Sequence, residues 1–388
     1  MPMLHQKIAY VIGARFPTSK AYGITARETL EVLNNNGYIV KVFCSKSDYY
    51  DKDFKNIEHI TENFPKSHIA NMLTKFGEMN SSRLNFIIWN LGLILKIIKS
   101  AGSICDFDPN LIWVRDPMIA LLYLQRNKTY NFIIEVHDQS GVFFYKRLIK
   151  YKDKIKFCPI NVRNENFIHE ICPQFRSQLA PMGIRKENLE NHKTCLSFID
   201  SLESRKHKGI KIAYIGKFAP GNYSKGIEDL IELAKLYSDN NEKFYVTLIG
   251  ANEEELRVYN NLKNSLHIKD KYLKIRRHTR HSKVIKAMHK YDVLVLPEYR
   301  SQEYSGMPIK LLEYLSSGKI TVVANTDLYR SLFTSEYKPF FYISGDKYSL
   351  DHAIKISLND KELEKKLIGG IDFASKFTWE KRTLEIIN

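Results

Sequence analysis

The chain has 388 residues, of which 44% are hydrophobic and 26% are charged, and its formal net charge is +16 at pH 7. This length suits two domains, and the composition excludes a disordered or low-complexity chain. The charge favours anionic partners, whether nucleotides, nucleic acid or acidic lipid. The five cysteines are scattered without a C-x-x-C pair, so they indicate neither a zinc site nor a disulfide framework, and a reducing, cytosolic setting is expected.

The first predicted element is a strand in the apolar run IAYVIGA, which leads into Arg15 and suits a strand better than a secretion signal. A loop of small and basic residues follows. Thr25 and Glu28 have the spacing of a capping box, which predicts a helix that starts there and presents apolar residues at helical spacing. Gly37 ends that helix, and YIVKVF is the next strand.

Residues 84–100, LNFIIWNLGLILKIIKS, form the most membrane-like stretch of the chain. Asn90 and Lys96 interrupt it, and it is shorter than the roughly 20 apolar residues that a membrane span needs. We predict a buried or interfacial helix. The basic, aromatic run at 141–157 either is a solvated loop or, with this helix, meets anionic lipid. We expect a cytoplasmic protein, free or peripheral on the inner face of the cell membrane.

Two segments of the chain resemble one another. KIAYVIGARFPTSKAYGITARETLEVL begins at Lys7, and KIAYIGKFAPGNYSKGIEDLIELA begins at Lys211. Each contains a short apolar strand, a glycine, a loop rich in small and basic residues, and an amphipathic helix. Further strands separated by helical patterns are predicted at 111–115, 131–137, 244–250, 272–277, 292–297 and 320–325. The alternation predicts the α/β class, with two Rossmann-like parallel-sheet domains facing each other across a cleft.

Ligands of open parallel sheets bind outside the carboxyl ends of the strands. Polar residues and glycines follow the predicted strands at Gly13 to Gly23, Arg115, His137, Gly216 to Lys225, Gly250, His278 and Glu298 to Gly306. The fold prediction therefore expects one site, shared between the two domains.

The stretch EYSGMPIKLLEYLSSGKITVV, residues 303–323, combines a loop, a helix and a buried strand. Pro308 suits the first turn of the helix, and Gly318 suits its end. Free backbone N–H groups at such a helix start favour an anion. Lys310 adds positive charge, and Glu313 is a carboxylate of the kind that holds sugar hydroxyls. The alternative is an ordinary helix–strand unit with a surface lysine.

Four segments, in their shared order, carry a family resemblance: YIGKFAPGNYSKGIEDLIELA, YDVLVLPEYRSQEYSGMPIKLLEYLSSGKITVVAN, APMGI at 180–184, and FTWEKR near the C-terminus. They resemble the glycosyltransferases of family 4, which are retaining enzymes with the GT-B fold and nucleotide-sugar donors. The resemblance implies an N-terminal acceptor-binding domain at 1–184, a less regular linker at 185–209, a nucleotide-sugar-binding domain at 210–370, and a C-terminal helix at 371–388 that returns to the first domain.

The same resemblance assigns the donor site. Lys217 and Lys225 would hold the donor diphosphate, since the departing nucleotide needs fixed positive charge, and Glu313 would accept hydrogen bonds from the ribose. The alternatives are solvated loop lysines and a surface glutamate. The other donor-binding positions are Gly23, Gly216, Gly250, His278, Ser305, Gly306, Met307, Pro308 and Lys310. Arg276 and His278 would border the base.

The sequence departs from the family pattern at one position. The family often has a first glutamate eight positions before the second, and that position here is Ser305, with Glu303 two residues earlier. Either Glu303 has taken over through a shifted loop, or Ser305 serves with the amides of Gly306 and Met307. The first glutamate commonly contacts the donor sugar, so this departure concerns the identity of that sugar.

In the first domain, His137 in EVHD matches the family histidine near the transferred sugar. With Lys217, Lys225 and Glu303 it completes the predicted catalytic set. Asp138 is assigned to the acceptor or to orienting His137. Arg115 in VRDP either faces the acceptor or fixes a loop.

The resemblance implies a retaining hexosyltransferase for a glycan or lipid-linked acceptor in bacterial surface polysaccharide, such as lipopolysaccharide, O-antigen or capsule. The donor would be UDP- or GDP-linked, without any other cofactor. Asp106 to Asp108, DFD, precede a strand at the wrong end of the sheet, so we predict a polar turn and no essential metal. The alternatives are a GT-B sugar-nucleotide epimerase, whose additional carboxylates are not evident, and a membrane-surface or nucleic-acid binding protein. No specific nucleic-acid module is evident.

Overall fold

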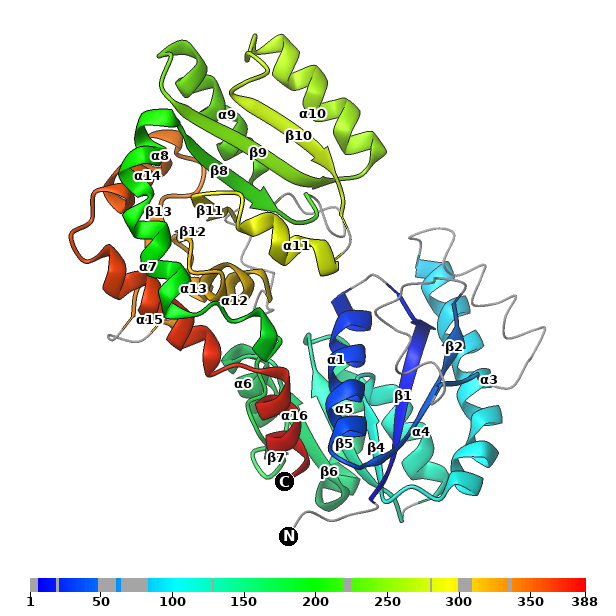
Figure 1. Ribbon diagram of the computed structural model, residues 1–388. Helices are drawn as coiled ribbons and strands as arrows, with labels where there is room; N and C mark the ends of the chain where they lie inside the picture. Colours follow the sequence, from blue (N-terminus) through cyan, green and yellow to red (C-terminus); the bar gives the residue numbers. More distant parts are fainter. Residues whose placement is uncertain are drawn as a thin grey trace. The chain divides into compact units, whose positions relative to one another are not determined.

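The computed structural model describes residues 6–18, 21–47, 61–63, 83–127, 129–218, 225–279, 281–298, 309–333 and 337–388. Their contacts divide the chain into two compact units (Figure 1). The first unit contains the described residues up to Met182 together with Trp379–Asn388, and the second contains those from Gly183 to Thr378. The predicted α/β class, with two parallel-sheet units, is confirmed.

The first unit is built on a parallel sheet with the strand order β3-β2-β1-β4-β5-β6-β7 among its described residues. The strands are β1 (Lys7–Phe16), β2 (Ile39–Lys46), β3 (Thr61–Asn63), β4 (Leu111–Val114), β5 (Asn131–Val136), β6 (Ile155–Pro159) and β7 (Arg176–Ser177). Ile8 pairs with Leu111 on one side and Val40 on the other. Strand β1 is therefore central and apolar on both faces, as expected in a parallel sheet.

Helices cover both faces of the first sheet. They are α1 (Ala21–Asn35), α3 (Arg83–Phe107), α4 (Pro117–Arg126), α5 (Val142–Leu148), α6 (Val162–Ile171) and α16 (Trp379–Ile387), with the 3₁₀ helix η2 (Ile149–Lys154) after α5. Alternate residues of β1 face opposite ways. Tyr10 packs in a cluster with residues of α1 and α16, and Val11 packs in a cluster with residues of α3, α4, α5 and α6.

The start of α1 and the extent of α3 differ from what the sequence predicts. Helix α1 begins at Ala21, so Thr25 lies inside the helix and is not its cap; its hydroxyl instead donates to the sulfur of Met182 at 3.7 Å. The stretch 84–100 is part of α3, which buries Ile97 and exposes Leu91. Among the described residues, no helix has the length and apolarity needed to cross a membrane.

The second unit has a parallel sheet whose described strands run in the order β10-β9-β8-β11-β12-β13. They are β8 (Ile210–Ile215), β9 (Phe244–Ala251), β10 (Leu273–Arg277), β11 (Val293–Leu296), β12 (Ile320–Ala324) and β13 (Phe340–Tyr342). The helices after β8 are α9 (Ile227–Asp239), α10 (Glu253–Ser265), α11 (His281–Met288), α12 (Ile309–Ser316), α13 (Asp327–Leu332), α14 (Lys347–Leu358) and α15 (Leu363–Ser375). One apolar cluster joins this sheet to its helices.

The segment 185–209 is more regular than the sequence predicts. It holds the 3₁₀ helix η3 (Lys186–Asn188) and the helices α7 (His192–Asp200) and α8 (Leu202–Lys208). Asn191 caps α7 by accepting from the N–H of Thr194 at 2.8 Å, and Cys195, Phe198 and Leu202 are buried in the core of the second unit. The sequence prediction is therefore wrong here, since the segment is not less regular than its neighbours. Its three buried apolar residues lie among polar and charged residues, so the helical pattern is weak in the sequence.

The C-terminus behaves as the fold prediction requires. Helix α15 ends in the second unit at Ser375, and α16 begins at Trp379 in the first unit. The returning helix is therefore shorter than the predicted segment 371–388. Arg382 of α16 donates to the backbone carbonyl of Ala180 at 3.3 Å, which anchors the helix within the first unit.

Candidate functional site

The carboxyl end of β8 is shaped by two glycines. Gly216 donates its N–H to the carbonyl of Ile249 at 2.7 Å. A Cβ at Gly250 would lie 1.8 Å from the carbonyl oxygen of Gly216, and the φ of Gly250 is +142°, a region that side chains disfavour. A Cβ at Gly216 would itself lie 1.8 Å from Cε of Lys310. The predicted glycines thus let two strand ends and one lysine side chain come together.

Five of the predicted donor-site residues influence one another electrostatically. Burial lowers the pKa of Lys310, and Lys225 and Lys217 lower it further, against Glu313 and Glu298. Burial also lowers the pKa of His278, helped by Lys217 and Lys310. Cations that depress one another's pKa values are close together, and a bound anion would relieve their repulsion.

Lys225 is held by a carboxylate that the sequence analysis did not assign to the site. Its ammonium lies 2.7 Å from Oε1 of Glu298, and the two side chains are only 13% and 12% exposed. The other carboxylate oxygen of Glu298 accepts from the Tyr329 hydroxyl at 2.5 Å. The sequence offered only the position of Glu298 after a strand as a signal, since its partners lie on distant segments.

Helix α12 carries Lys310 and Glu313 to the same end of the sheet. Glu313 is 5% exposed, so the alternative of a surface glutamate does not hold. The neighbouring Tyr314 fixes the helix against β8, because its hydroxyl accepts from the N–H of Ile215 at 2.8 Å and donates to its carbonyl at 3.3 Å. Lys217, by contrast, is exposed, as is Arg276 on β10.

Several predicted positions lie outside the described residues: Glu303, Ser305, Gly306, Met307 and Pro308. The choice between Glu303 and Ser305 therefore stays a prediction.

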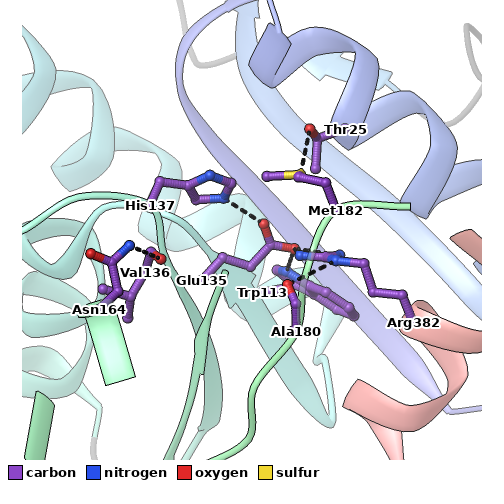
Figure 2. Close-up of polar contacts among 9 residues, drawn as sticks. All are labelled: Thr25, Trp113, Glu135, Val136, His137, Asn164, Ala180, Met182 and Arg382. Carbon is purple, nitrogen blue, oxygen red and sulfur yellow. Dashed lines mark hydrogen bonds and ion pairs between the residues drawn. The ribbon is translucent and has the colours of Figure 1, made fainter. Parts of the chain in front are cut away.

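In the first unit, a fully buried carboxylate stands at the centre of a hydrogen-bond network (Figure 2). Glu135 on β5 accepts from the indole N–H of Trp113 at 3.0 Å and from the guanidinium of Arg382 at 3.2 Å. Its other oxygen lies 2.8 Å from Nε2 of His137. Figure 2 also shows the amide of Asn164 directed at the carbonyl of Val136, where it donates at 3.1 Å.

This network fixes the charges of Glu135 and His137. Burial alone would raise the pKa of Glu135, but Arg382, His137 and Arg115 together hold it well below its usual range. Burial and Arg115 lower the pKa of His137 to about 4, against Glu135. An ionised carboxylate can only accept, so Nε2 of neutral His137 carries the proton. Nδ1 is then the nitrogen that can accept a hydrogen bond.

The two predicted acceptor residues have different surroundings. Nη1 of Arg115 is buried and has no hydrogen-bond partner among the described residues. Its guanidinium carbon lies 5.9 Å from the ring centroid of Tyr22, and burial lowers the pKa of its side chain. Asp138 is exposed and accepts from the N–H of Ser140 at 2.8 Å. One nitrogen of Arg115 thus has no hydrogen-bond partner among the described residues, whereas Asp138 shapes the turn before α5.

Two further predictions concern backbone positions. A Cβ at Gly23 would lie 2.4 Å from the carbonyl oxygen of Thr18, so the close approach of α1 to the preceding loop requires glycine there. Asp106 lies in α3, and Asp108 precedes β4 with a φ of 50°. This is the amino end of the strand. Within the described ranges, no three His, Cys, Asp or Glu residues are grouped as metal ligands.

The sequence analysis did not identify Glu135 and Arg382 of the first unit, and only Glu135 has a recognisable sequence pattern. Glu135 is a charged residue inside the apolar strand NFIIEV, and a charge buried in this way needs partners. That pattern could have identified it. Arg382 gave no such signal, since it is 247 positions away from Glu135 in the sequence.

Residues 199–370 match the model of the family described as glycosyl transferases group 1. No curated protein matches the sequence. A solved structure of sucrose-phosphate synthase from Thermosynechococcus elongatus is similar, with 15% identity, a TM-score of 0.70, and coverage of 98% of this chain and 97% of that one. Anabaena Alr3699/HepE in complex with UDP and glucose has 13% identity and a TM-score of 0.67, with coverage of 99% and 98%.

The lipopolysaccharide outer core galactosyltransferase WaaB in its apo form is similar as well, with 12% identity, a TM-score of 0.65, and coverage of 98% of this chain and 99% of that one. At these identities the likeness shows the fold, which is GT-B.

Proposed function

Because residues 199–370 match the model of the glycosyl transferases group 1 family and the chain has a GT-B fold, we propose that it is a retaining, metal-independent glycosyltransferase. It moves a sugar from a UDP- or GDP-linked donor to a glycan or lipid-linked acceptor. The observation that carries the proposal is the lysine cluster at the carboxyl end of β8 and the start of α12, where burial and two neighbouring lysines depress the pKa of Lys310.

The lysine cluster suits a diphosphate for electrostatic reasons. The leaving nucleoside diphosphate gains negative charge as the bond to the sugar breaks, and fixed cations stabilise that charge most when they are positioned in advance. Glu298 holds Lys225 in position through a 2.7 Å contact. In this proposal the donor phosphate contacts Lys225 in addition to Glu298, and Lys217 and Lys310 bind the remaining phosphate oxygens.

The buried carboxylate of Glu313 binds the ribose of the donor. Glu313 is 5% exposed, and among the neighbouring charges it raises the pKa of Lys310 most. It therefore lies beside the lysine cluster, where a carboxylate can accept hydrogen bonds from two adjacent ribose hydroxyls. His278 follows β10, where its backbone N–H donates to the carbonyl of Ala251 at 2.9 Å. Together with Arg276 it borders the base of the donor. The Anabaena structure is a complex with UDP and glucose, which supports UDP as the first nucleotide to test.

The proposed reaction transfers the sugar with retention of configuration at its anomeric carbon. The bond between the anomeric carbon and the phosphate oxygen breaks, and the acceptor oxygen forms a bond to the same face of that carbon. The acceptor proton passes to the departing phosphate, so no protein nucleophile is needed. Nδ1 of neutral His137 accepts a hydrogen bond from a sugar hydroxyl. Arg115, whose Nη1 has no hydrogen-bond partner in the described part of the chain, binds the acceptor.

We assign the enzyme to bacterial surface polysaccharide synthesis, on the cytoplasmic side of the cell membrane and peripheral to it. The family and the charge of +16 support this assignment. WaaB, a lipopolysaccharide outer core galactosyltransferase, is an example of such a role on the same fold.

The proposal is tested by a thermal-shift screen of the purified chain against UDP, GDP, ADP, CMP and their common sugar conjugates, without added metal. A ligand of the folded state raises the unfolding temperature by mass action. We expect a shift with one diphosphate, lost in Lys225→Ala and in Glu313→Ala. The matched control is Lys235→Ala, since Lys235 lies on α9 and pairs with Asp239.

No shift with any nucleotide would contradict the proposal. Turnover separates the remaining alternatives. A transferase releases free nucleotide only when an acceptor is present, whereas an epimerase converts the donor without any acceptor. Lys225→Ala should lower turnover severely, and near-wild-type turnover in that variant would refute its role at the diphosphate.

A further inference from the structure

Helix α5 and the 3₁₀ helix η2 expose apolar side chains on their outer face. Phe143 is 58% exposed, Val142 39% and Ile149 36%. The inner face of the same segment already anchors it, because Tyr145 and Leu148 are buried in the core of the first unit. The packing of the inner face is enough to hold such a surface helix in place, so apolar residues on its outer face do not contribute to the core.

Basic side chains surround these apolar residues. The exposed cations of the segment are Lys146, Arg147, Lys150 and Lys154. None of them forms an ion pair with a carboxylate in the described part of the chain. The guanidinium carbon of Arg147 lies 4.3 Å from the ring centroid of Phe143, so charge and aromatic surface are presented together. Asp153 is the one acidic residue of the sequence between 142 and 154.

We propose that the outer face of α5 and η2 docks on an anionic lipid bilayer. Val142, Phe143 and Ile149 enter the region between the head groups and the acyl chains, and the four cations contact lipid phosphates. This combination of apolar penetration and basic charge is what interfacial helices use. The aliphatic side chains at the centre of this surface also favour a bilayer over nucleic acid. A protein surface that binds nucleic acid combines cations with aromatic rings that stack on the bases.

The position of this surface gives it a role in the proposed reaction. Helix α5 begins at Val142, five residues after His137 at the carboxyl end of β5. The docking surface therefore adjoins the strand ends of the first unit, where Nη1 of Arg115 has no hydrogen-bond partner among the described residues. On the proposed function, a lipid-linked acceptor would reach these residues from the bilayer. The docking itself does not depend on that function.

The test is co-sedimentation of the full chain with vesicles of phosphatidylcholine alone and of phosphatidylcholine mixed with phosphatidylglycerol. We expect binding to the mixed vesicles, weakened by salt. Each cation near an anionic surface raises the partition coefficient by about 5-fold. The variant Lys146→Gln/Arg147→Gln/Lys150→Gln, which removes three cations, should therefore lower it by about 100-fold. Val142→Ser/Phe143→Ser should lower it by about tenfold.

The matched control is Val258→Ser. Val258 is 55% exposed, but it lies on α10, whose first turn is acidic, so its replacement should leave the partition coefficient unchanged. Thermal unfolding of each variant reports on folding. The nucleotide-induced shift should survive in the surface variants, and vesicle binding should survive in Lys225→Ala, which separates this proposal from the donor site.

Three outcomes would overturn the proposal. The first is equal sedimentation with and without vesicles. The second is binding that Val142→Ser/Phe143→Ser and Val258→Ser change to the same extent. The third is binding that a DNA oligonucleotide abolishes while Val142→Ser/Phe143→Ser leaves it unchanged, which would assign the cations to nucleic acid.

Discussion

Replacing Gly216 with alanine should displace Lys310 while the fold is retained. The new Cβ would lie 1.8 Å from Cε and 2.8 Å from Nζ of Lys310, and 2.9 Å from the hydroxyl of Tyr214. Both lysine atoms are at the far end of a flexible side chain, so the ammonium moves more easily than the backbone of β8. The change in the free energy of unfolding should be about 1 kcal/mol, as for most single substitutions.

The effect on ligand binding should be larger. A hydrogen bond between a charged lysine and a phosphate contributes about 1.5–3 kcal/mol, and its loss corresponds to a Kd that is roughly 10- to 150-fold weaker. Gly216→Ala should therefore bind the nucleoside diphosphate weakly although the variant is folded. This separation of binding from stability is the specific consequence of the contact between Gly216 and Lys310.

The assay is titration calorimetry with the diphosphate identified by the thermal-shift screen. We compare the wild type, Gly216→Ala, Lys310→Ala and the double variant. Because the alanine acts by moving Lys310, it should add little once Lys310 has been removed, and the double variant should bind like Lys310→Ala. Additive losses, or wild-type affinity in Gly216→Ala, would refute the reasoning that the alanine acts by moving Lys310, and wild-type affinity in Lys310→Ala would show that Lys310 is not at the ligand.

Three further predictions follow from the two units. Arg382→Met removes a partner of buried Glu135 and should lower the free energy of unfolding by about 3–5 kcal/mol; Glu135→Gln/Arg382→Met should recover part of it in denaturant titrations. The pKa of His137 is about 4 in the folded protein and about 6.5 in an unfolded chain. The unfolded state therefore binds more protons between these values, and stability should fall by at most about 3 kcal/mol as the pH drops from 6.5 to 4. In pH-dependent unfolding, His137→Asn should flatten this slope. Activity should survive EDTA; loss of activity that manganese restores would refute metal independence.

Much of the fold could be predicted because its signals are local. Each strand is a short apolar run followed by a glycine or polar residue, and the segments from Lys7 and Lys211 repeat that pattern. The helices α7 and α8 were missed for the opposite reason. Their buried residues Cys195, Phe198 and Leu202 are few, and the adjacent charges dominate the local composition.

The candidate site divides in the same way. Lys217, Lys225 and Glu313 could be named as site candidates from the sequence because they lie in segments whose order resembles that of a known family. The partners of these groups could not. Glu298 is 73 positions from Lys225, and Arg382 is 247 positions from Glu135. Only the folded chain brings such residues together, because nothing in the local pattern of either segment refers to the other.

The two units use a buried carboxylate with opposite consequences for ligand binding. Glu135 is contacted by Trp113, Arg382 and His137, so its charge is taken up within the first unit. Its main effect is to fix the proton of His137, which leaves a neutral hydrogen-bond acceptor.

Glu298, in contrast, pairs with Lys225 at 2.7 Å, and Glu298 and Glu313 together offset only part of the charge of the three lysines in the second unit's cluster. Lys217 and Lys310 still act as cations strongly enough to depress the pKa of His278. A positive excess therefore remains at the strand ends of the second unit, and a diphosphate, which carries at least two negative charges, fits that excess. The neutral acceptor of the first unit fits a sugar hydroxyl instead. The different charges of the two networks are thus the physical reason for assigning the nucleotide to the second unit.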